Sequence, residues 1–452
     1  MKRVHLCDLR DGQLTDKDYY GSGGELLLSR STMLTTVHLL ALKRRGVTNL
    51  YVKESGDSEE LDRLLNEGVG ATSFLPFEDL EEQVFSVDEM KNIGFGEDGL
   101  LKLLDSWAVN EVEARIEKGI HGDKPNGSPL SAKLQDKGTS VRSECYKNKI
   151  VDNYIGSKEV LLSLLNKLHQ GSKVDFGTIE KTTQVFIDHF IHDRNIVLNL
   201  SMIKPKAGDY VAHHSFNVAL LSMAIATSLG YSEKQVWEVV MCGMLHDCGM
   251  FLVPREVLEK NGRYTKEELF EIHKHPVSGL HILEGVKRLP EAVLIGVYQS
   301  HERENGKGYP KLRKGRLIHN YAKIVQVADI FDALCSPRPF RKRYIPYKAI
   351  EMMLGMVRHG FISQTHTKGL LKFVSLFPVG SLVELNTGQF AKVIQSNGSS
   401  FAKPVVRILY DKGNRILPAD QQKVENLADT ISLRIVRAHG FDLPDFSYMD
   451  GF

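Results

Sequence analysis

The 452-residue chain lacks several features that mark particular classes of protein. No uninterrupted apolar run approaches the roughly 18 residues that a membrane-spanning helix needs, so we expect no membrane span. No CxxC pair occurs, and the odd number of widely spread cysteines argues against a disulfide scaffold and against a zinc finger. These cysteines are Cys7, Cys145, Cys242, Cys248 and Cys335.

An excess of charge of one sign is also missing. Lysine and arginine number 58 against 56 aspartate and glutamate, and the formal net charge of +2 gives no reason to expect duplex nucleic acid as a partner. The N-terminus places Asp8 where an export signal would need apolar residues, so a cytoplasmic location is expected. The apolar fraction of 42% and the charged fraction of 25% are typical of a soluble globular protein.

The chain does contain successive segments with different residue patterns, which predict a multidomain and mainly α-helical protein. Residues 1–119 combine short β-like runs, such as 49–52, with a helical stretch over 30–45, which indicates a small N-terminal α/β module with a helical extension. Residues 120–149 are rich in Gly, Lys, Asp, Ser and Pro, a composition that is typical of a linker.

A helical domain is predicted over residues 150–372, where capping-box patterns begin helices at Ser232 and Thr265. The helix expected over 151–168 could form a seam in a homodimer, receive a signalling partner or simply pack in the core. The pattern then changes to alternation of apolar and polar residues, for example in 381–385 and 405–409, and predicts a small C-terminal β-rich module over 373–452.

Within the helical domain, histidines and aspartates occur at positions that ordinary helix composition does not explain. Imidazole and carboxylate groups hold iron, manganese, nickel or zinc, and a carboxylate can bridge two ions whereas a neutral imidazole cannot. The sequence therefore predicts a His/Asp metal site. Its candidate ligands are His214, His246, Asp247, His275, His301 and Asp329.

The two aspartates carry the strongest signal because both lie in apolar surroundings. Asp247 follows the apolar run 239–245, and Asp329 lies within the apolar segment 325–331. A carboxylate in such a place is costly unless it is hydrogen-bonded or binds a cation. Asp329 taken alone would equally fit a helix cap or a salt-bridged acid.

Single histidines are weaker signals than the combination. A lone histidine on an apolar face is more often a core residue than a ligand, and we interpret His273, His281 and His319 as core or exposed residues of that kind. The metal hypothesis therefore depends on the joint occurrence of two buried acids and four histidines in one helical domain.

The order of these residues, together with the stretch His301-Glu302-Arg303-Glu304-Asn305-Gly306-Lys307-Gly308-Tyr309-Pro310, resembles the HD-GYP family of cyclic di-GMP phosphodiesterases, a branch of the HD metal-dependent phosphohydrolases. The similarity spans about residues 200–350 and implies a helical HD-type domain in the middle of the chain. It implies hydrolysis of cyclic di-GMP to pGpG, with further cleavage to GMP left open, by a hydroxide that bridges two divalent ions. Iron or manganese is expected, with nickel or zinc as alternatives.

The resemblance also implies roles for individual residues. His214, His246, Asp247 and Asp329 would hold one ion, while His275 and His301 would hold a second ion that Asp247 bridges to the first. The catalytic residues would be Asp247, His246 and His301. Glycine lets the backbone approach a ligand closely, tyrosine offers a stacking face for a base, and arginine suits bidentate phosphate contacts. The implied substrate-binding residues are Gly308, Tyr309, Pro310, Asp332, Arg338 and Arg341.

The sequence departs from the family pattern at three positions. Ser300 replaces a histidine that usually precedes His301, and Met250 replaces a lysine expected near the scissile phosphate. Tyr210 stands where members with a third metal have glutamate, so we expect two ions at most. These losses leave an alternative function open, a degenerate member that binds cyclic di-GMP or a protein partner as a non-catalytic sensor or scaffold. Another HD-type nucleotide phosphohydrolase is disfavoured by the GYP stretch.

Overall fold

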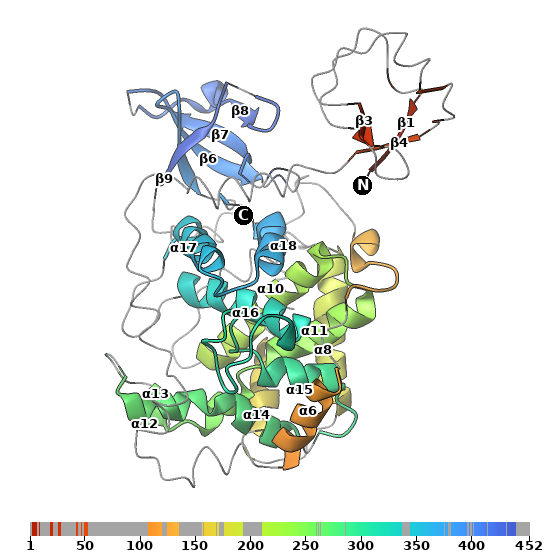
Figure 1. Ribbon diagram of the computed structural model, residues 1–452. Coiled ribbons are helices and arrows are strands. Elements are labelled where there is room, and N and C mark those ends of the chain that lie inside the picture. The colour runs from red at the N-terminus through yellow and green to blue at the C-terminus, as the bar shows by residue number, and fades with distance from the viewer. Residues whose placement is uncertain are drawn as a thin grey trace. The chain divides into compact units, whose positions relative to one another are not determined.

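The computed structural model describes short stretches within residues 2–52 and, apart from short gaps, residues 107–134, 156–192, 210–336, 344–377 and 381–439 (Figure 1). The chain divides into two compact units, Met1–Gly68 and Val69–Phe452. Among the described helices, none combines the length and the apolar character that crossing a membrane requires.

The described part of the first unit is a four-stranded antiparallel sheet with the order β1-β4-β2-β3. The strand predicted over 49–52 is confirmed as β4, in which Leu50 is fully buried. Of the helix predicted over 30–45, residues 42 and 43 are helical and the others lie outside the described residues. The strands are β1 (Lys2–His5), β2 (Tyr19–Tyr20), β3 (Leu26–Leu28) and β4 (Asn49–Val52).

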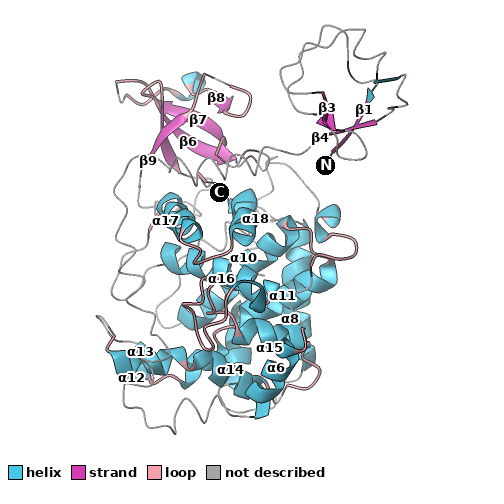
Figure 2. Cartoon of the chain, viewed as in Figure 1, coloured by secondary structure: helices cyan, strands magenta, loops and turns pink. Residues whose placement is uncertain are grey.

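The second unit is mainly helical, which confirms the predicted class for its central part (Figure 2). Short 3-10 turns connect some of its helices: η2 (Leu130–Lys133), η3 (Cys248–Leu252) and η4 (Gly315–Leu317). The α-helices are α6 (Trp107–Glu117), α8 (Phe176–His192), α10 (Tyr210–Ser228), α11 (Glu233–Leu245), α12 (Arg255–Leu258), α13 (Lys266–His273), α14 (His275–Leu283), α15 (Glu291–Tyr298), α16 (Asn320–Cys335), α17 (Pro346–Arg358) and α18 (Gln364–Val374).

Helix α10 lies at the centre of this helical body and contacts α11, α16 and α18 (Figure 1). Its sequence is apolar on nearly every face, and a helix of that kind is stable in water only when other helices surround it. Phe216, Leu220 and Met223 are accordingly buried. The same holds for α16, so the candidate ligands on these two helices point into the interior.

Both predicted capping boxes are present. The Ser232 backbone N–H donates to Gln235 Oε1 at 3.3 Å, and α11 begins at the next residue. The Thr265 N–H donates to Glu268 Oε2 at 2.7 Å, and the Glu268 N–H donates to Thr265 Oγ1 at 3.3 Å, where α13 begins. These helix starts were predictable because a capping box depends only on residues three positions apart.

Two segments before residue 150 pack on the helical domain. Helix α6 buries Val109, Val112 and Ile116 against apolar residues of α14 and α15. The turn η2 buries Leu130, whose N–H donates to the Tyr231 carbonyl at 3.0 Å. The helical domain therefore has contacts in the predicted N-terminal module, 1–119, and in the predicted linker, 120–149. The predicted boundaries at 119, 149 and 372 stay predictions.

The C-terminal residues form a five-stranded antiparallel sheet with the order β8-β7-β6-β5-β9. The predicted runs 381–385 and 405–409 coincide with β5 and β7, in which Val383, Leu385, Val406 and Ile408 are buried at alternate positions. The β-rich prediction is thus confirmed. The strands are β5 (Leu382–Leu385), β6 (Phe390–Gln395), β7 (Val405–Tyr410), β8 (Val424–Asn426) and β9 (Ile435–His439), with the turn η5 (Ala419–Gln421) before β8.

Candidate metal centre

The fold brings all six predicted ligands to one buried place. His214 lies in the second turn of α10, and Asp329 lies in the middle of α16. His246 and Asp247 follow α11 directly, and His275 is the first residue of α14. His301 comes just after α15. The ligands therefore converge from segments that are separated by up to 115 residues along the chain.

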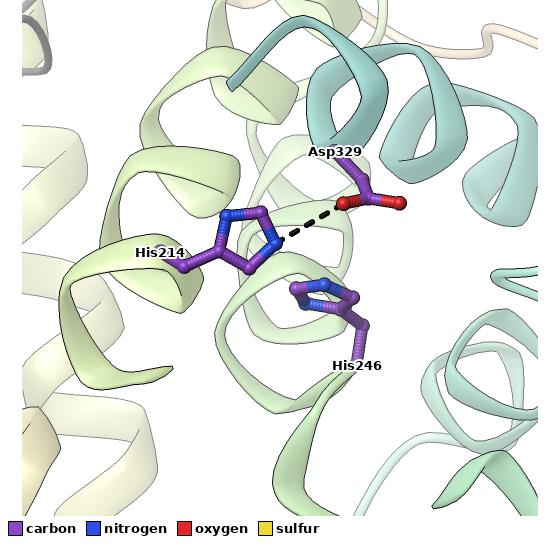
Figure 3. A group of neighbouring side chains, drawn as sticks. All are labelled: His214, His246 and Asp329. Atoms are coloured by element: carbon purple, nitrogen blue, oxygen red, sulfur yellow. Dashed lines mark hydrogen bonds and ion pairs between the residues drawn. The ribbon is translucent and has the colours of Figure 1, made fainter. Parts of the chain in front are cut away.

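Three of these residues form a first group. The candidate ligand atoms of His214, His246 and Asp329 all lie within 4.8 Å of one another. Figure 3 shows the three side chains pointing towards one another, with a dashed line between His214 and Asp329. The distance between His214 Nε2 and Asp329 Oδ1 is 3.1 Å. This group could hold one metal ion.

Asp247, His275 and His301 form a second group, whose candidate ligand atoms also lie within 4.8 Å of one another. Asp247 Oδ1 is 3.3 Å from His275 Nε2 and 3.5 Å from His301 Nε2. The same oxygen is 3.3 Å from His246 Nε2, and Asp247 Oδ2 is 3.7 Å from His214 Nε2. Asp247 thus lies between the two groups, where a carboxylate could contact ions in both.

Hydrogen bonds at the far side of the rings set which nitrogen faces the centre. His246 Nδ1–H donates to the Gly243 carbonyl at 2.9 Å, and His275 Nδ1–H donates to the Ile272 carbonyl at 2.7 Å. A carbonyl oxygen only accepts, so each neutral ring keeps its hydrogen on Nδ1 and its lone pair on Nε2. That tautomer is the one that binds metal through Nε2.

The inward-facing nitrogens fit a cation. The Nε2 atoms of His246, His275 and His301 are buried and have no hydrogen-bond partner among the described residues. His301 Nε2 faces Asp247 at 3.5 Å, and the Nε2 lone pairs of His246 and His275 face the same carboxylate, which only accepts. Lone pairs that face each other at these distances repel unless a proton or a metal ion lies between them. The donor set therefore fits a metal centre.

The electrostatics agree with this interpretation. Burial alone would raise the pKa of Asp247, but the surrounding His246, His275 and His301 lower it well below its usual range. Burial would likewise raise the pKa of Asp329, yet the hydrogen bond with His214 and the neighbouring histidines lower it. Burial lowers the pKa of His301 to about 4. Asp247 and Asp329 therefore remain ionised although they are buried, and the His301 ring beside them is neutral. A bound cation would stabilise the two buried negative charges.

The structure places Asp332 behind a candidate ligand. Its Oδ2 is 2.6 Å from His214 Nδ1, and its Oδ1 accepts a hydrogen bond from Asn217 Nδ2 at 2.8 Å. Its side chain is buried, and both carboxylate oxygens are already engaged within the protein. The position differs from the predicted substrate contact, because Asp332 orients the His214 ring and so leaves His214 Nε2 facing the centre.

The GYP stretch lies directly against the second group. The Tyr309 N–H donates to the His301 carbonyl at 3.1 Å, and the Tyr309 ring stacks on the His301 ring with centroids 5.0 Å apart. Gly308 permits this approach, since a Cβ there would lie 2.4 Å from the His301 carbonyl oxygen. Pro310 is buried. Arg338 and Arg341 lie outside the described residues.

Sequence reasoning missed the part played by His273. It is buried, as the core interpretation predicted, but its ring also stacks on Tyr309 with centroids 4.0 Å apart. Burial, followed by the effects of His275 and His301, lowers its pKa to about 3, so the ring is neutral. The signal that could have revealed it is its position two residues before His275, across the short break between α13 and α14.

The two main departures from the family pattern have clear structural outcomes. Ser300 is buried, and its hydroxyl donates a hydrogen bond to the Val297 carbonyl at 2.8 Å. The hydroxyl hydrogen is therefore already used at the C-terminal end of α15. Met250 lies in η3 and brings no positive charge to the site.

Comparison with known proteins identifies the two modules of the second unit. Residues 198–362 match the HD domain family. Residues 382–441 match the family described as KOW domain associated with HD domain. Residues 198–362 form an HD domain. The HD domain contains all six candidate ligands, and the small C-terminal sheet is a KOW domain.

Relatives of the HD domain confirm the resemblance to the HD-GYP family. A cyclic di-GMP phosphodiesterase of Pseudomonas aeruginosa is 28% identical over 333 residues, which cover 72% of this chain and 79% of that protein. The cyclic di-GMP phosphodiesterase response regulator RpfG of Xanthomonas campestris is 38% identical over 26% of this chain and 32% of its own length. A 3'3'-cGAMP-specific phosphodiesterase of Vibrio cholerae is 29% identical over 32% of this chain and 34% of its own length. The last two matches thus span about a third of each relative.

Proposed function

We propose that this protein is a metal-dependent phosphodiesterase that hydrolyses cyclic di-GMP to pGpG, with further cleavage to GMP left open. The observation that carries the proposal is the pair of neighbouring three-residue ligand groups, of which the second includes Asp247. Two-ion sites of this kind are typical of enzymes that cleave phosphodiesters by in-line displacement. The names of the relatives support cyclic di-GMP as the substrate.

We assign each ligand group to one divalent ion, iron or manganese. His214, His246 and Asp329 would hold the first ion, His275 and His301 would hold the second, and Asp247 would contribute to both. Bound ions supply Lewis-acid polarisation of a phosphate oxygen and a water of lowered pKa. The chain itself fixes the rings of His246 and His275 through their Nδ1–H bonds to backbone carbonyls.

The loop that follows His301 provides the surroundings for a cyclic dinucleotide. Gly308 keeps the backbone close to the second ligand group, and Tyr309 closes the space over His301. Basic residues of the same loop favour an anionic ligand, although exposed charges of this kind are frequently only solvated. These residues are Lys307, Lys311, Lys314 and Arg316. Cyclic GMP-AMP is also an anionic cyclic dinucleotide, so it is the competing substrate.

Ser300 and Met250 make a non-catalytic receptor the alternative. The loss of one ligand weakens the binding of the second ion, and the loss of one cation weakens the stabilisation of charge at the phosphate. Both changes lower the rate of hydrolysis more than the affinity for the nucleotide. The six retained ligands and the retained GYP stretch favour catalysis over this alternative.

The proposal is tested by counting metal ions per chain after anaerobic purification and following cyclic di-GMP and 3'3'-cGAMP by chromatography with added Fe²⁺ or Mn²⁺. We expect two ions per chain and the appearance of pGpG. Asp247→Ala should lose most of the metal and reduce turnover at least about 10³-fold, because the carboxylate shared by both groups is removed. Asp420→Ala is the matched control, because Asp420 is exposed in the KOW domain.

Different results would distinguish the alternatives. Nucleotide that binds without being cut, with one ion or none, would make the protein a receptor. Preferential cleavage of 3'3'-cGAMP would correct the substrate. Full metal content in Asp247→Ala would show that the ligand assignment is wrong.

A further inference from the structure

A carboxylate outside the HD domain match reaches the loop that covers the candidate metal centre. Glu113 lies on α6, and its Oε1 accepts a hydrogen bond from the Tyr298 hydroxyl at 2.8 Å. Its Oε2 forms an ion pair with Arg313 Nη2, across a separation of 200 residues in sequence. Only 14% of the Glu113 side chain and 15% of the Arg313 side chain are exposed. The ion pair is therefore shielded from water.

Arg313 ends a loop whose beginning is the ligand His301. The Glu302 carboxylate closes this loop, because it accepts backbone N–H bonds from Lys311 and Arg313, each at 2.7 Å. Glu302 is fully buried. The backbone of Arg313 is therefore held by Glu302 and its side chain by Glu113, so two carboxylates fix the same end of the loop.

The loop between these anchors carries Tyr309, which stacks on His301 and on His273. A shift of the Arg313 end would be transmitted to Tyr309 through only three intervening residues. Gly308 leaves little room for such a shift, since its backbone lies against the His301 carbonyl. The packing of the loop therefore holds Tyr309 over the second ligand group.

Helix α6 is well placed to act as a fixed support. Its buried face of Val109, Val112 and Ile116 packs on α14, which begins with His275, and on α15, which ends just before His301 (Figure 1). Tyr298, the last residue of α15, is fully buried against α6, and its hydroxyl donates a hydrogen bond to the Glu113 carboxylate that pairs with Arg313. The same helix therefore contacts the helix that begins with His275 and the helix that ends three residues before His301.

We propose that Glu113 is a positioning residue for the nucleotide site, which holds the 302–313 loop through Arg313 and keeps Tyr309 over His301. The inference rests on the proposed function for its effect on cyclic di-GMP, but the positioning itself does not depend on catalysis. It makes α6 a part of the working site although this helix lies well before residues 198–362.

The first test is hydrogen exchange of the full chain. In Glu113→Ala, amides of 301–315 should exchange at least about tenfold faster, because the loss of a hydrogen bond to a charged group loosens the end of the loop. Amides of α10 and α16 should keep their protection. Glu111→Ala is the matched control, since Glu111 lies on the same helix and pairs with Arg115 instead.

The second test is steady-state turnover of cyclic di-GMP with Mn²⁺ in excess. Glu113→Ala should raise KM about tenfold while kcat changes much less, because the ligand groups themselves are untouched. Glu113→Gln keeps one accepting oxygen for Arg313 and can donate its amide N–H to the Tyr298 hydroxyl oxygen, so it should recover part of the difference. Arg313→Met should have the effect of Glu113→Ala, and the double variant should be no worse than either single variant.

Each outcome decides a separate point. Unchanged exchange and KM in Glu113→Ala would overturn the proposal. Faster exchange throughout the HD domain would overturn it as well, because Glu113 would then support only the fold. If the wild-type protein does not cut cyclic di-GMP, the proposed function fails, while the exchange of 301–315 still decides whether Glu113 holds the loop.

Discussion

At the scale of single residues, the contact between Asp332 and His214 shows how the chain prepares a ligand. Asp332 Oδ2 lies 2.6 Å from His214 Nδ1, and Asn217 holds the other oxygen. The arrangement fixes both the tautomer and the rotation of the His214 ring. Carboxylates behind metal-binding histidines typically change metal affinity roughly 10–100-fold when they are removed.

Asp332→Asn should therefore weaken metal binding about 10–100-fold, because an amide cannot accept from both His214 and Asn217 with the same strength. KM for cyclic di-GMP at saturating metal should change little. Competition with a metal-binding dye measures the affinity, and Asp420→Asn serves as the control. A raised KM with unchanged metal affinity would instead support the substrate-binding role that the family resemblance implied for Asp332.

At the scale of elements, the close approach of η3 to the start of α14 positions two neighbouring ligands, Asp247 and His275. Gly249 makes this approach feasible. A Cβ at this position would lie 2.0 Å from the His275 carbonyl oxygen and 2.7 Å from the Gly279 nitrogen. Both of these atoms belong to backbone, so the contact cannot be relieved by a change of side-chain rotamer.

Gly249→Ala should thus push η3 and α14 apart and destabilise the protein by about 3 kcal/mol, as overpacking of backbone typically does. His275 should move with α14, so the metal content should fall as well. Thermal unfolding and metal analysis measure the two effects. Gly156→Ala is the control, because Gly156 is helical and a Cβ added there would meet no atom within 4 Å. A stable, fully metallated Gly249→Ala would contradict the expected movement of α14.

Local signals explain which elements were predictable from the sequence. The starts of α11 and α13 followed from capping residues three positions apart, and β5 and β7 followed from alternation. The candidate ligands could be proposed from the sequence because Asp247 follows an apolar run and Asp329 lies within one. Glu113 gave no such signal, since a glutamate on an amphipathic helix is ordinary and its partner Arg313 lies 200 residues away.

At the scale of the whole molecule, the contacts of the HD domain begin well before residues 198–362. Helix α6 buries three aliphatic side chains on α14 and α15, and η2 buries Leu130 beside Tyr231. Burial of a single aliphatic side chain stabilises a fold by about 1.5–3 kcal/mol, counted as an upper estimate. The α6 contact alone is therefore comparable with the net stability of many domains.

A shortened chain that begins at residue 150 should consequently be about 6 kcal/mol less stable than the full chain, the amount expected from four aliphatic side chains, three on α6 and Leu130 in η2. A chain that begins at residue 69 retains α6 and η2 and lacks only the first compact unit, so it is the matched control. Chemical denaturation monitored by fluorescence compares the three proteins. Equal midpoints for the chains that begin at 69 and at 150 would show that α6 adds nothing to stability.

The convergence of the ligands from α10, α11, α14, α15 and α16 also has a thermodynamic consequence. A cation held by these groups acts as a cross-link between distant parts of the chain, and the unfolded protein has no comparable binding site. Free metal at 100 times its dissociation constant adds about 2.7 kcal/mol to stability by mass action. The metal supply of the cell would then set the amount of folded protein that survives proteolysis, as well as its rate of turnover.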